Sequence, residues 1–287
     1  MSEPLVSVVV PVRDGAGLIG RQLEALAGQV GAPSFEVVVA DNGSSDGLAG
    51  VVGGFAGRLD VRVVDASARR GASFARNVGA LGHARGAKVL FCDADDCVTD
   101  GWVRSLAGGL DRFGIVTGPL VHVARLPDRV DVAGFRGLAA PRLSVVGLPY
   151  GDSANLGLRR EVFESLDGFD TELLRGEDQD LSIRAQVAGH GLGWVDDAVV
   201  FVADRGTVGQ GMRQFFLYGL WEVAVSRKYA RSNRVERSVW SMVRPYVGLV
   251  GRSWQVLSGR TRRAWLVRAS HRAGRLAGSA KFRHWCP

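Results

Sequence analysis

Residues 88–96 read KVLFCDADD, an apolar run that ends in three aspartates. Such a run is typical of a buried strand whose carboxyl end opens onto a polar site. Asp93, Asp95 and Asp96 would repel one another unless a cation lies among them. Hard oxygen ligands suit Mg²⁺ or Mn²⁺, which take further oxygens from water and substrate phosphates. The stretch therefore predicts metal–diphosphate binding at a strand end, and a solvated turn that caps the next helix is the structural alternative.

The segments on either side of this stretch alternate between strand-like and helical patterns. Strands are predicted for LVSVVVPV (5–12), FEVVVAD (35–41) and VRVVDA (61–66), and helices for LIGRQLEALAGQ (18–29) and SFARNVGALGHA (73–84). Alternation of this kind predicts a mostly parallel sheet with helices on both faces. Ligands of such sheets bind at the carboxyl ends of the strands, so the residues there are candidate site residues.

The second half of the chain is less regular. A loop is predicted for 125–152, a short helix for 160–166, one strand for 192–203 and a long amphipathic helix for 212–231. The segment GEDQDLSIRAQVAGHG (176–191) predicts a helix with acids in its first turn and glycine at its end. Asp180 and Arg184 are four residues apart on this helix and are expected to form a structural pair.

Residues 15–20, GAGLIG, match the glycine pattern of a dinucleotide-binding loop, and Asp41 follows Gly20 by 21 positions. An NAD-dependent oxidoreductase is therefore an alternative function. Arg13 and Asp14 nevertheless separate the strand from Gly15, and the helix is expected to begin only near Leu18. The favoured interpretation is a loop and first helical turn that does not cradle a pyrophosphate.

The charge of the chain is divided unevenly. Residues 227–287 hold 15 Lys and Arg against one acid, a net +14, whereas residues 1–226 hold 21 against 28, a net −7. The tail predicts basic amphipathic helices that lie on an anionic membrane, pack on the acidic body or, least favoured, bind nucleic acid. The sequence contains no run of 18 uncharged apolar residues, so no membrane-spanning helix is predicted. Three cysteines without metal-ligand spacing favour a reducing cytoplasm.

Six segments in order resemble the family-2 glycosyltransferases of the type-A fold. They are VSVVVPVRD, FEVVVADNGSSDG, GASFARNVGALGHARG, VLFCDADD, SANLGLRREVFESLDGFD and GEDQDLSIRAQVAGHG, and they lie within residues 5–225. The resemblance implies a Rossmann-like α/β fold with a catalytic domain over 1–225. Its nucleotide-binding half would be 1–100 and its acceptor-binding half 101–225, followed by the basic helical tail 226–287.

The resemblance also implies roles for single residues. The nucleotide contacts would be Pro11, Arg13, Asp41, Asn42, Arg76, Asn77 and Asp93. Asp95 and Asp96 would bind the metal, and Asn155 would lie near the sugar or the acceptor. Asp178, beside Glu177, would be the general base. Structural alternatives are a surface ion pair for Arg76 and a turn side chain for Asn155.

The reaction that the resemblance implies is transfer of a sugar, with inversion, from a nucleotide-diphosphate sugar to a hydroxyl group of a glycan, a lipid-linked or a small-molecule acceptor. The cofactor would be Mn²⁺ or Mg²⁺. The enzyme would act in the cytoplasm or on the inner face of the membrane, and it would not bind nucleic acid. Many relatives carry a His within the segment VVFVADRGTVGQG (199–211), where this chain has none. Asp204 or Arg205 is expected to replace it. An inactive sugar-nucleotide-binding relative is a further alternative.

Overall fold

The computed structural model describes residues 4–123, 125–126, 140–203, 206–230 and 239–286. The chain forms two compact units. The first comprises residues 1–142, 149–171 and 177–204, and the second comprises residues 143–148, 172–176 and 205–287. Helix α7 (Val208–Lys228) thus belongs to the second unit, whereas the sequence placed most of it in the catalytic domain. The extent of the catalytic domain itself stays a prediction.

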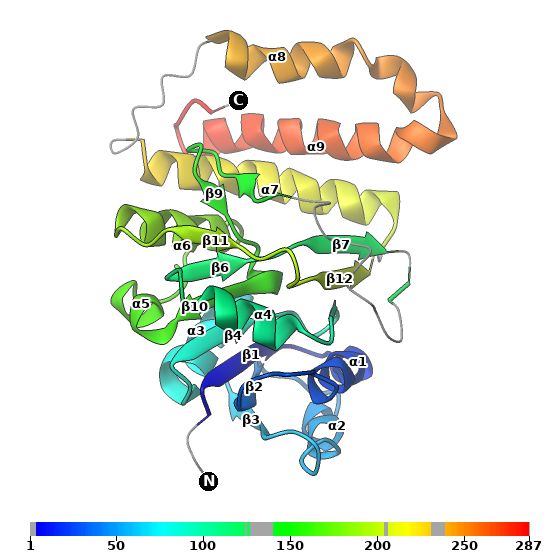
Figure 1. Cartoon of the computed structure of the whole chain (residues 1–287). Coiled ribbons are helices and arrows are strands. Elements are labelled where there is room, and N and C mark those ends of the chain that lie inside the picture. Colours follow the sequence, from blue (N-terminus) through cyan, green and yellow to red (C-terminus); the bar gives the residue numbers. More distant parts are fainter. Residues whose placement is uncertain (1–3, 124, 127–139, 204–205, 231–238, 287) are drawn as a thin grey trace. The chain divides into compact units, whose positions relative to one another are not determined.

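A seven-stranded sheet forms the centre of the first unit, in the order β11-β6-β10-β4-β1-β2-β3 (Figure 1). The strands are β1 (Val6–Val12), β2 (Phe35–Asp41), β3 (Val61–Asp65), β4 (Lys88–Phe91), β6 (Ile115–Thr117), β10 (Leu156–Arg159) and β11 (Leu192–Trp194). Strands β3, β2, β1 and β4 are parallel, and β10 runs antiparallel to both of its neighbours. The predicted mostly parallel sheet is confirmed.

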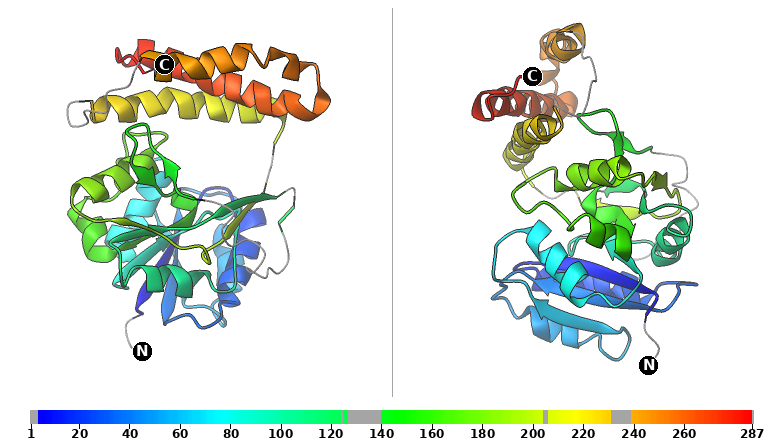
Figure 2. Two further views of the ribbon diagram at one scale, coloured as in Figure 1. Left: turned by 45° about the horizontal axis from the view of Figure 1, so that its top comes forward. Right: turned by 90° about the vertical axis from the view of Figure 1, so that its left-hand side faces the viewer.

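Helices cover both faces of this sheet, as Figure 2 shows. Val8 and Val10 of β1 pack in one core and Val9 in the other, because successive side chains point to opposite faces. The first core includes residues of α1 (Ala16–Ala27), α2 (Leu48–Gly53) and α4 (Trp102–Gly109). The second includes residues of α3 (Ala72–Asn77), the π-helix η1 (Val78–His83), α5 (Arg160–Ser165) and α6 (Glu177–Val187). Burial on both faces explains why the parallel strands read as continuous apolar runs.

The strand predicted over 192–203 is wrong in one respect, because the segment forms two strands in different sheets. β11 joins the large sheet, and β12 (Val200–Ala203) lies between β5 (Cys97–Val98) and β7 (Leu120–Val123). The amide of Ala198 donates to the carbonyl of Val195 at 3.1 Å, which closes a turn between the two strands. The predicted loop over 125–152 contains the short strands β8 (Arg142–Leu143) and β9 (Pro149–Tyr150), and its residues 127–139 lie outside the described part.

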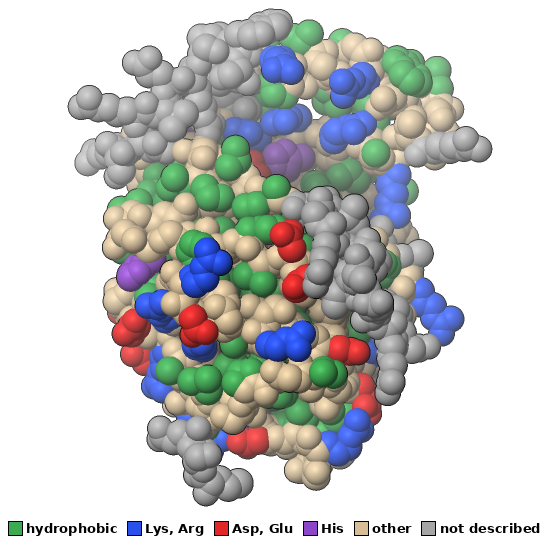
Figure 3. Space-filling view, viewed as in Figure 1, with side chains coloured by type: hydrophobic (Ala, Val, Ile, Leu, Met, Phe, Trp, Pro, Cys, Tyr) green, Lys and Arg blue, Asp and Glu red, His purple; other side chains and the backbone are tan. Residues whose placement is uncertain are grey.

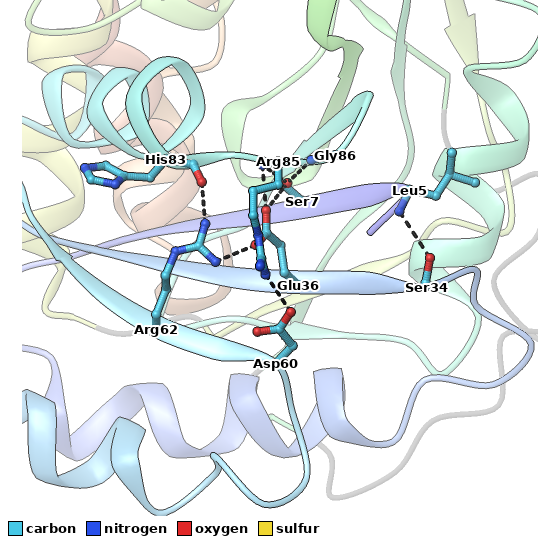
Figure 4. Close-up of polar contacts among 9 residues, drawn as sticks. All are labelled: Leu5, Ser7, Ser34, Glu36, Asp60, Arg62, His83, Arg85 and Gly86. Carbon is cyan, nitrogen blue, oxygen red and sulfur yellow. Dashed lines mark hydrogen bonds and ion pairs between the residues drawn. The ribbon is translucent and has the colours of Figure 1, made fainter. Parts of the chain in front are cut away.

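Figure 4 shows a buried polar cluster, which lies at the starts of β1 and β2, whereas the predicted site lies at the carboxyl ends of these strands. The fully buried carboxylate of Glu36 accepts from the Ser7 hydroxyl at 2.5 Å and from the Arg85 Nε at 2.6 Å, and it is paired with Arg62. Burial alone would raise the pKa of Glu36, but the hydrogen bonds from Arg62, Ser7 and Arg85 lower it to about 2. This cluster joins the starts of β1 and β2 to β3 and to the segment before β4.

Within its described residues, the second unit contains three helices of 12 residues or more, α7, α8 (Val239–Val250) and α9 (Gly259–Lys281), and the short 3₁₀ helix η4 (Ser253–Val256). Helices α7 and α9 lie side by side in Figures 1 and 2. Glycines allow their backbones to touch: a Cβ on Gly274 would lie 2.0 Å from the Phe216 carbonyl, and one on Gly219 2.0 Å from the His271 carbonyl. The helices predicted for the tail are therefore confirmed, and α9 packs against α7.

Candidate active site

Arg76 connects the two acidic motifs that the sequence singles out. Its guanidinium, from α3, lies 2.7 Å from the Asp93 carboxylate after β4 and 3.5 Å from the Glu177 carboxylate at the start of α6. The ring of Phe169 lies 5.7 Å from the guanidinium carbon. The Arg76 residue is only 3% exposed, so the surface ion pair offered as its alternative role is not what the structure contains. The DADD and EDQD segments thus meet at one place.

Asp178 occupies the first turn of α6, where its carboxylate accepts from two backbone amides. Oδ2 accepts from the Ser153 amide at 3.4 Å, and Oδ1 accepts from the Gln179 amide at 2.7 Å. Burial, followed by the nearby charges of Glu177 and Asp152, raises the pKa of Asp178 to about 8. The helix dipole and the amide bonds act in the opposite direction and do not overcome these causes. A carboxylate with this pKa can accept a proton near neutral pH.

Asp152 is a candidate site residue that the sequence did not indicate. It is one of the charges that raise the pKa of Asp178, and it is itself paired with Arg142. The Arg142 guanidinium carbon lies 5.5 Å from the centre of the Tyr150 ring. Both charged residues lie in the stretch interpreted as a loop, and no motif there marks them. Only the fold brings them to the acidic helix.

The loops after β1 and β2 are joined by hydrogen bonds. Across the two loops, the Asp14 carboxylate accepts from the Ser45 amide at 2.9 Å, and within the loop after β2 the Asp41 carboxylate accepts from the Ser44 amide at 2.8 Å. Asp14 has a positive φ of 48°, and its carboxylate lies 3.8 Å from the half-exposed Arg13. The structure therefore brings Arg13 and Asp41 to neighbouring strand ends.

Pro11 belongs to the same edge of the sheet. It pairs in register with Ala40 of β2, one residue before Asp41. Because a proline has no amide to donate, β1 loses one donor there, close to its carboxyl end. Pro11 is thus near Arg13 and Asp41, two of the predicted nucleotide contacts.

Two predicted nucleotide contacts use their amide groups to hold backbone. The Asn42 Nδ2 donates to the carbonyls of Ala66 and Arg69, while its Oδ1 accepts from the Gly71 amide at 2.9 Å. The Asn77 Nδ2 donates to the Phe169 carbonyl, and its Oδ1 accepts from the Phe169 amide, both at 2.8 Å. These side chains fix the segments that surround the site.

Asn155 is fully buried and links separate parts of the first unit. Its Oδ1 accepts from the Trp102 indole at 2.8 Å, and its Nδ2 donates to the carbonyls of Pro119 at 3.0 Å and Ala198 at 2.7 Å. These partners use both ends of the amide. The turn alternative is therefore replaced by a core role, and Trp102 is likewise a core side chain.

The two aspartates expected to bind metal differ in burial. Asp95 is exposed, whereas Asp96 is 4% exposed. Within the described residues, no group of three or more His, Cys, Asp and Glu side chains is arranged to hold a metal ion. Mg²⁺ commonly takes one or two carboxylates and completes its shell with water and substrate phosphate. The exposed Asp95 carboxylate fits such a site, and the buried Asp96 fits it less well. Asp204 and Arg205, expected to replace the missing His, lie outside the described residues.

The glycine loop does not form a dinucleotide site. Helix α1 begins at Ala16, two residues before the predicted start, and the Ala16 amide donates to the Asp46 carboxylate at 2.7 Å. A carboxylate thus occupies the helix N-terminus where a pyrophosphate would bind. Nothing lies within 4 Å of a Cβ built on Gly20, so this glycine does not serve the close helix–strand packing of that motif. The NAD alternative is wrong.

Comparison with known proteins agrees with this geometry. The model of the family described as glycosyl transferase family 2 matches residues 7–166. Glycosyltransferase AglE of Haloferax volcanii is 29% identical over 204 residues, which cover 68% of this chain and 66% of that protein. The pre-mycofactocin glycosyltransferase of Mycobacterium tuberculosis is 30% identical over 210 residues, which cover 68% of this chain and 42% of that protein. The chain therefore spans between about two fifths and two thirds of the length of these relatives.

Solved structures show the same fold at lower identity. A mannosyltransferase from Pyrobaculum calidifontis, in complex with GDP-Man and Mn²⁺, superposes with a TM-score of 0.65 at 21% identity and covers 97% of this chain and 88% of that one. Residues 1–349 of S. aureus TarS, in complex with UDP-GlcNAc, superpose with a TM-score of 0.57 at 17% identity, and the match covers 98% of this chain and 93% of that fragment. The fold is the type-A glycosyltransferase fold, and the chain belongs to glycosyl transferase family 2.

Proposed function

We propose that this protein transfers a sugar from a nucleotide-diphosphate sugar to an acceptor hydroxyl, with inversion at the anomeric carbon. The observation that carries the proposal is the Arg76 bridge, since it brings the strand-end Asp93 to the acidic start of α6. A donor held at the strand ends would then lie beside Asp178. The family membership and the nucleotide sugars bound by the structural neighbours support this assignment.

Asp178 is the proposed base. A hydroxyl becomes a better nucleophile as its proton is removed, and a carboxylate with a pKa near the working pH removes it best. The pKa of about 8 gives Asp178 this property. Glu177 and Asp152 act through Asp178, because their negative charges favour its protonated form. The acceptor oxygen would attack the anomeric carbon directly while the bond to the diphosphate breaks, so no covalent enzyme intermediate forms.

The donor is proposed to contact Pro11, Arg13, Asp41 and Asp93 at the strand ends. Asn42, Asn77 and Asn155 position the surrounding backbone, and Arg76 holds Asp93. A divalent cation, Mn²⁺ or Mg²⁺, would be held by Asp95 together with the diphosphate. When bound, it would neutralise the charge that develops on the leaving diphosphate.

The acceptor is proposed to be a glycan, a lipid-linked or a small-molecule hydroxyl compound, and the site of action the cytoplasm or the inner face of the membrane. No helix among the described residues has the length and apolar character to cross a bilayer. Contact with a membrane is proposed to be peripheral, through the basic tail.

Thermal unfolding with UDP, GDP and dTDP, each with and without Mn²⁺, tests the proposal, with NAD as the negative control. A ligand at 100 times its Kd stabilises the folded state by about 2.7 kcal/mol. We expect a Mn²⁺-dependent rise in Tm with one nucleoside diphosphate. Asp95→Ala should remove the Mn²⁺ dependence, while Glu164→Gln, on the exposed side of α5, should not.

The reaction is tested separately with the donor that matches the nucleotide found. Slow release of free sugar from the donor is expected with the wild type and lost with Asp178→Asn, while the Tm shift persists. Retained turnover in Asp178→Asn would remove it as the base. Absence of any nucleotide shift would contradict the proposed function as a whole.

A further inference from the structure

A row of exposed apolar side chains runs along α8 and η4. Its exposed fractions range from 41% for the first residue to 85% for the last. The residues are Val243, Val247, Val250, Trp254 and Leu257. They are spaced by four and three positions, which places those on α8 along one face of the helix. This row is called the α8 stripe below.

An adjacent side of α8 already has a partner. The Tyr246 hydroxyl donates to the Arg272 carbonyl of α9 at 3.3 Å, and the Trp265 indole of α9 donates to the Leu249 carbonyl at 3.1 Å. The Arg272 guanidinium also lies over the Tyr246 ring. Val243, Val247 and Val250 remain 41%, 53% and 72% exposed, so the contacts with α9 leave the α8 stripe uncovered. Five large apolar groups in water are unfavourable unless another surface covers them.

The surroundings of the stripe are strongly basic. Residues 239–287 contain ten Lys and Arg and no Asp or Glu. Several of these cations are exposed, and they come from α8, from the turn after it and from α9: Arg244, Arg252, Arg262, Arg263 and Arg268. Figure 3 shows Lys and Arg side chains interspersed with hydrophobic ones over α8 and α9. The surface that covers the stripe must therefore offer apolar groups to the stripe and negative charges to the surrounding arginines.

We propose that the α8 stripe inserts into the interfacial region of an anionic phospholipid membrane, with the surrounding arginines on the lipid phosphates. The stripe supplies buried apolar area and the arginines supply attraction to anionic lipid, the two contributions that together give stable interfacial binding. Trp254 favours the same depth, because an indole is most stable at the boundary between headgroups and acyl chains. This inference does not depend on the transfer reaction.

Two other occupants fit the stripe less well. A second copy of the chain would bring one set of arginines against another, and like charges repel. Nucleic acid would attract the arginines but would leave Val247 and Leu257 in water. Membrane lipid is the surface that satisfies both kinds of side chain.

Flotation of the full chain with vesicles tests the proposal. We expect binding to vesicles that mix phosphatidylcholine with phosphatidylglycerol, and about tenfold weaker binding to phosphatidylcholine alone or at high salt. Val247→Ser combined with Leu257→Ser should reduce the partition coefficient about tenfold or more, since binding follows buried apolar area. Val187→Ser is the matched control, because Val187 is 71% exposed at the end of α6 and should leave flotation unchanged.

The outcomes separate the occupants. Equal flotation of the wild type and the double variant would overturn the proposal. It would also be overturned if the chain bound duplex DNA as strongly as vesicles and the apolar substitutions did not weaken that binding. A wild type that is dimeric in light scattering and becomes monomeric in the double variant, without vesicle binding, would assign the stripe to a second copy. The nucleotide-dependent Tm shift should be equal in all variants, so a failure here is distinct from a failure of the proposed function.

Discussion

Arg76 and Asp93 form an ion pair with a distance of 2.7 Å between Nη2 and Oδ1, and the arginine is almost fully buried. The second carboxylate near this guanidinium, that of Glu177, comes from a segment about one hundred residues away in sequence. One cation thus balances acids from two motifs. Breaking such a pair from one side is costly, because the remaining charges lose their partner.

Replacement of Arg76 is expected to destabilise the fold. Arg76→Met should lower the free energy of unfolding by about 2 kcal/mol, because Asp93 is partly exposed and can regain some hydration. Urea unfolding at pH 7 measures the change. Arg160→Met, which breaks the exposed pair with Glu164, should cost less than about 0.5 kcal/mol. Equal effects of the two substitutions would contradict a buried bridging role.

Asp178 is expected to make stability depend on pH. Its folded pKa of about 8 exceeds its ordinary value of 3.8, so the folded state retains a proton that the unfolded state releases. Its contribution to stability is full below about pH 4 and is lost as the pH rises through 8. The free energy of unfolding of Asp178→Asn, measured relative to that of the wild type, should therefore rise by at least about 1 kcal/mol from pH 5 to pH 8. Unfolding at the two pH values measures this, and a constant difference would argue against the raised pKa.

Asp152 and Arg142 are expected to move the pH profile of the enzyme in opposite directions. Asp152→Asn removes a negative charge near Asp178, so the pKa of the base falls and activity should persist to lower pH. Arg142→Gln leaves the Asp152 charge without its partner, so the midpoint should move to higher pH. The pH dependence of donor hydrolysis measures both midpoints. Shifts of the same sign would contradict this electrostatic role of the two residues.

Glu36 should stabilise the fold at neutral pH and not in acid. Its folded pKa of about 2 lies below its ordinary 4.5, so its contribution is present above pH 4.5 and is lost as the pH falls toward 2. Glu36→Gln should cost about 2–3 kcal/mol at pH 7 and progressively less below pH 4. Glu24→Gln, in an exposed pair with Arg58, is the control and should have little effect. A cost of Glu36→Gln that does not change with pH would refute the charge argument.

Gly274 should be required for the contact between α7 and α9. Gly274→Ala would place a methyl group 2.0 Å from the Phe216 carbonyl, so the helices must separate, at about 2–3 kcal/mol. Gly248→Ala in α8 meets nothing within 4 Å and should stabilise by about 0.5–1 kcal/mol, because alanine favours a helix. Calorimetry of the two variants compares them. Similar Tm values would mean that the crossing is looser than the structure shows.

The sequence alone determined the features that depend on neighbours along the chain. The β-branched runs specified β1 and β2. The spacing of four residues specified the ion pair of Asp180 with Arg184, whose Oδ2 and Nε atoms lie 2.8 Å apart. The order of motifs identified the family and therefore the fold. These properties follow from side-chain period and local spacing, which a sequence carries directly.

The tertiary structure decided which distant groups meet and how deeply they are buried. Nothing local to Asn155 predicts that both ends of its amide are used in the core, and nothing local to Asp152 predicts its effect on Asp178. The division of 192–203 between two sheets likewise depends on where its neighbouring strands lie. Burial and the summed charge at a point are properties of the packed chain, so the pKa of the proposed base was fixed only when these segments came together.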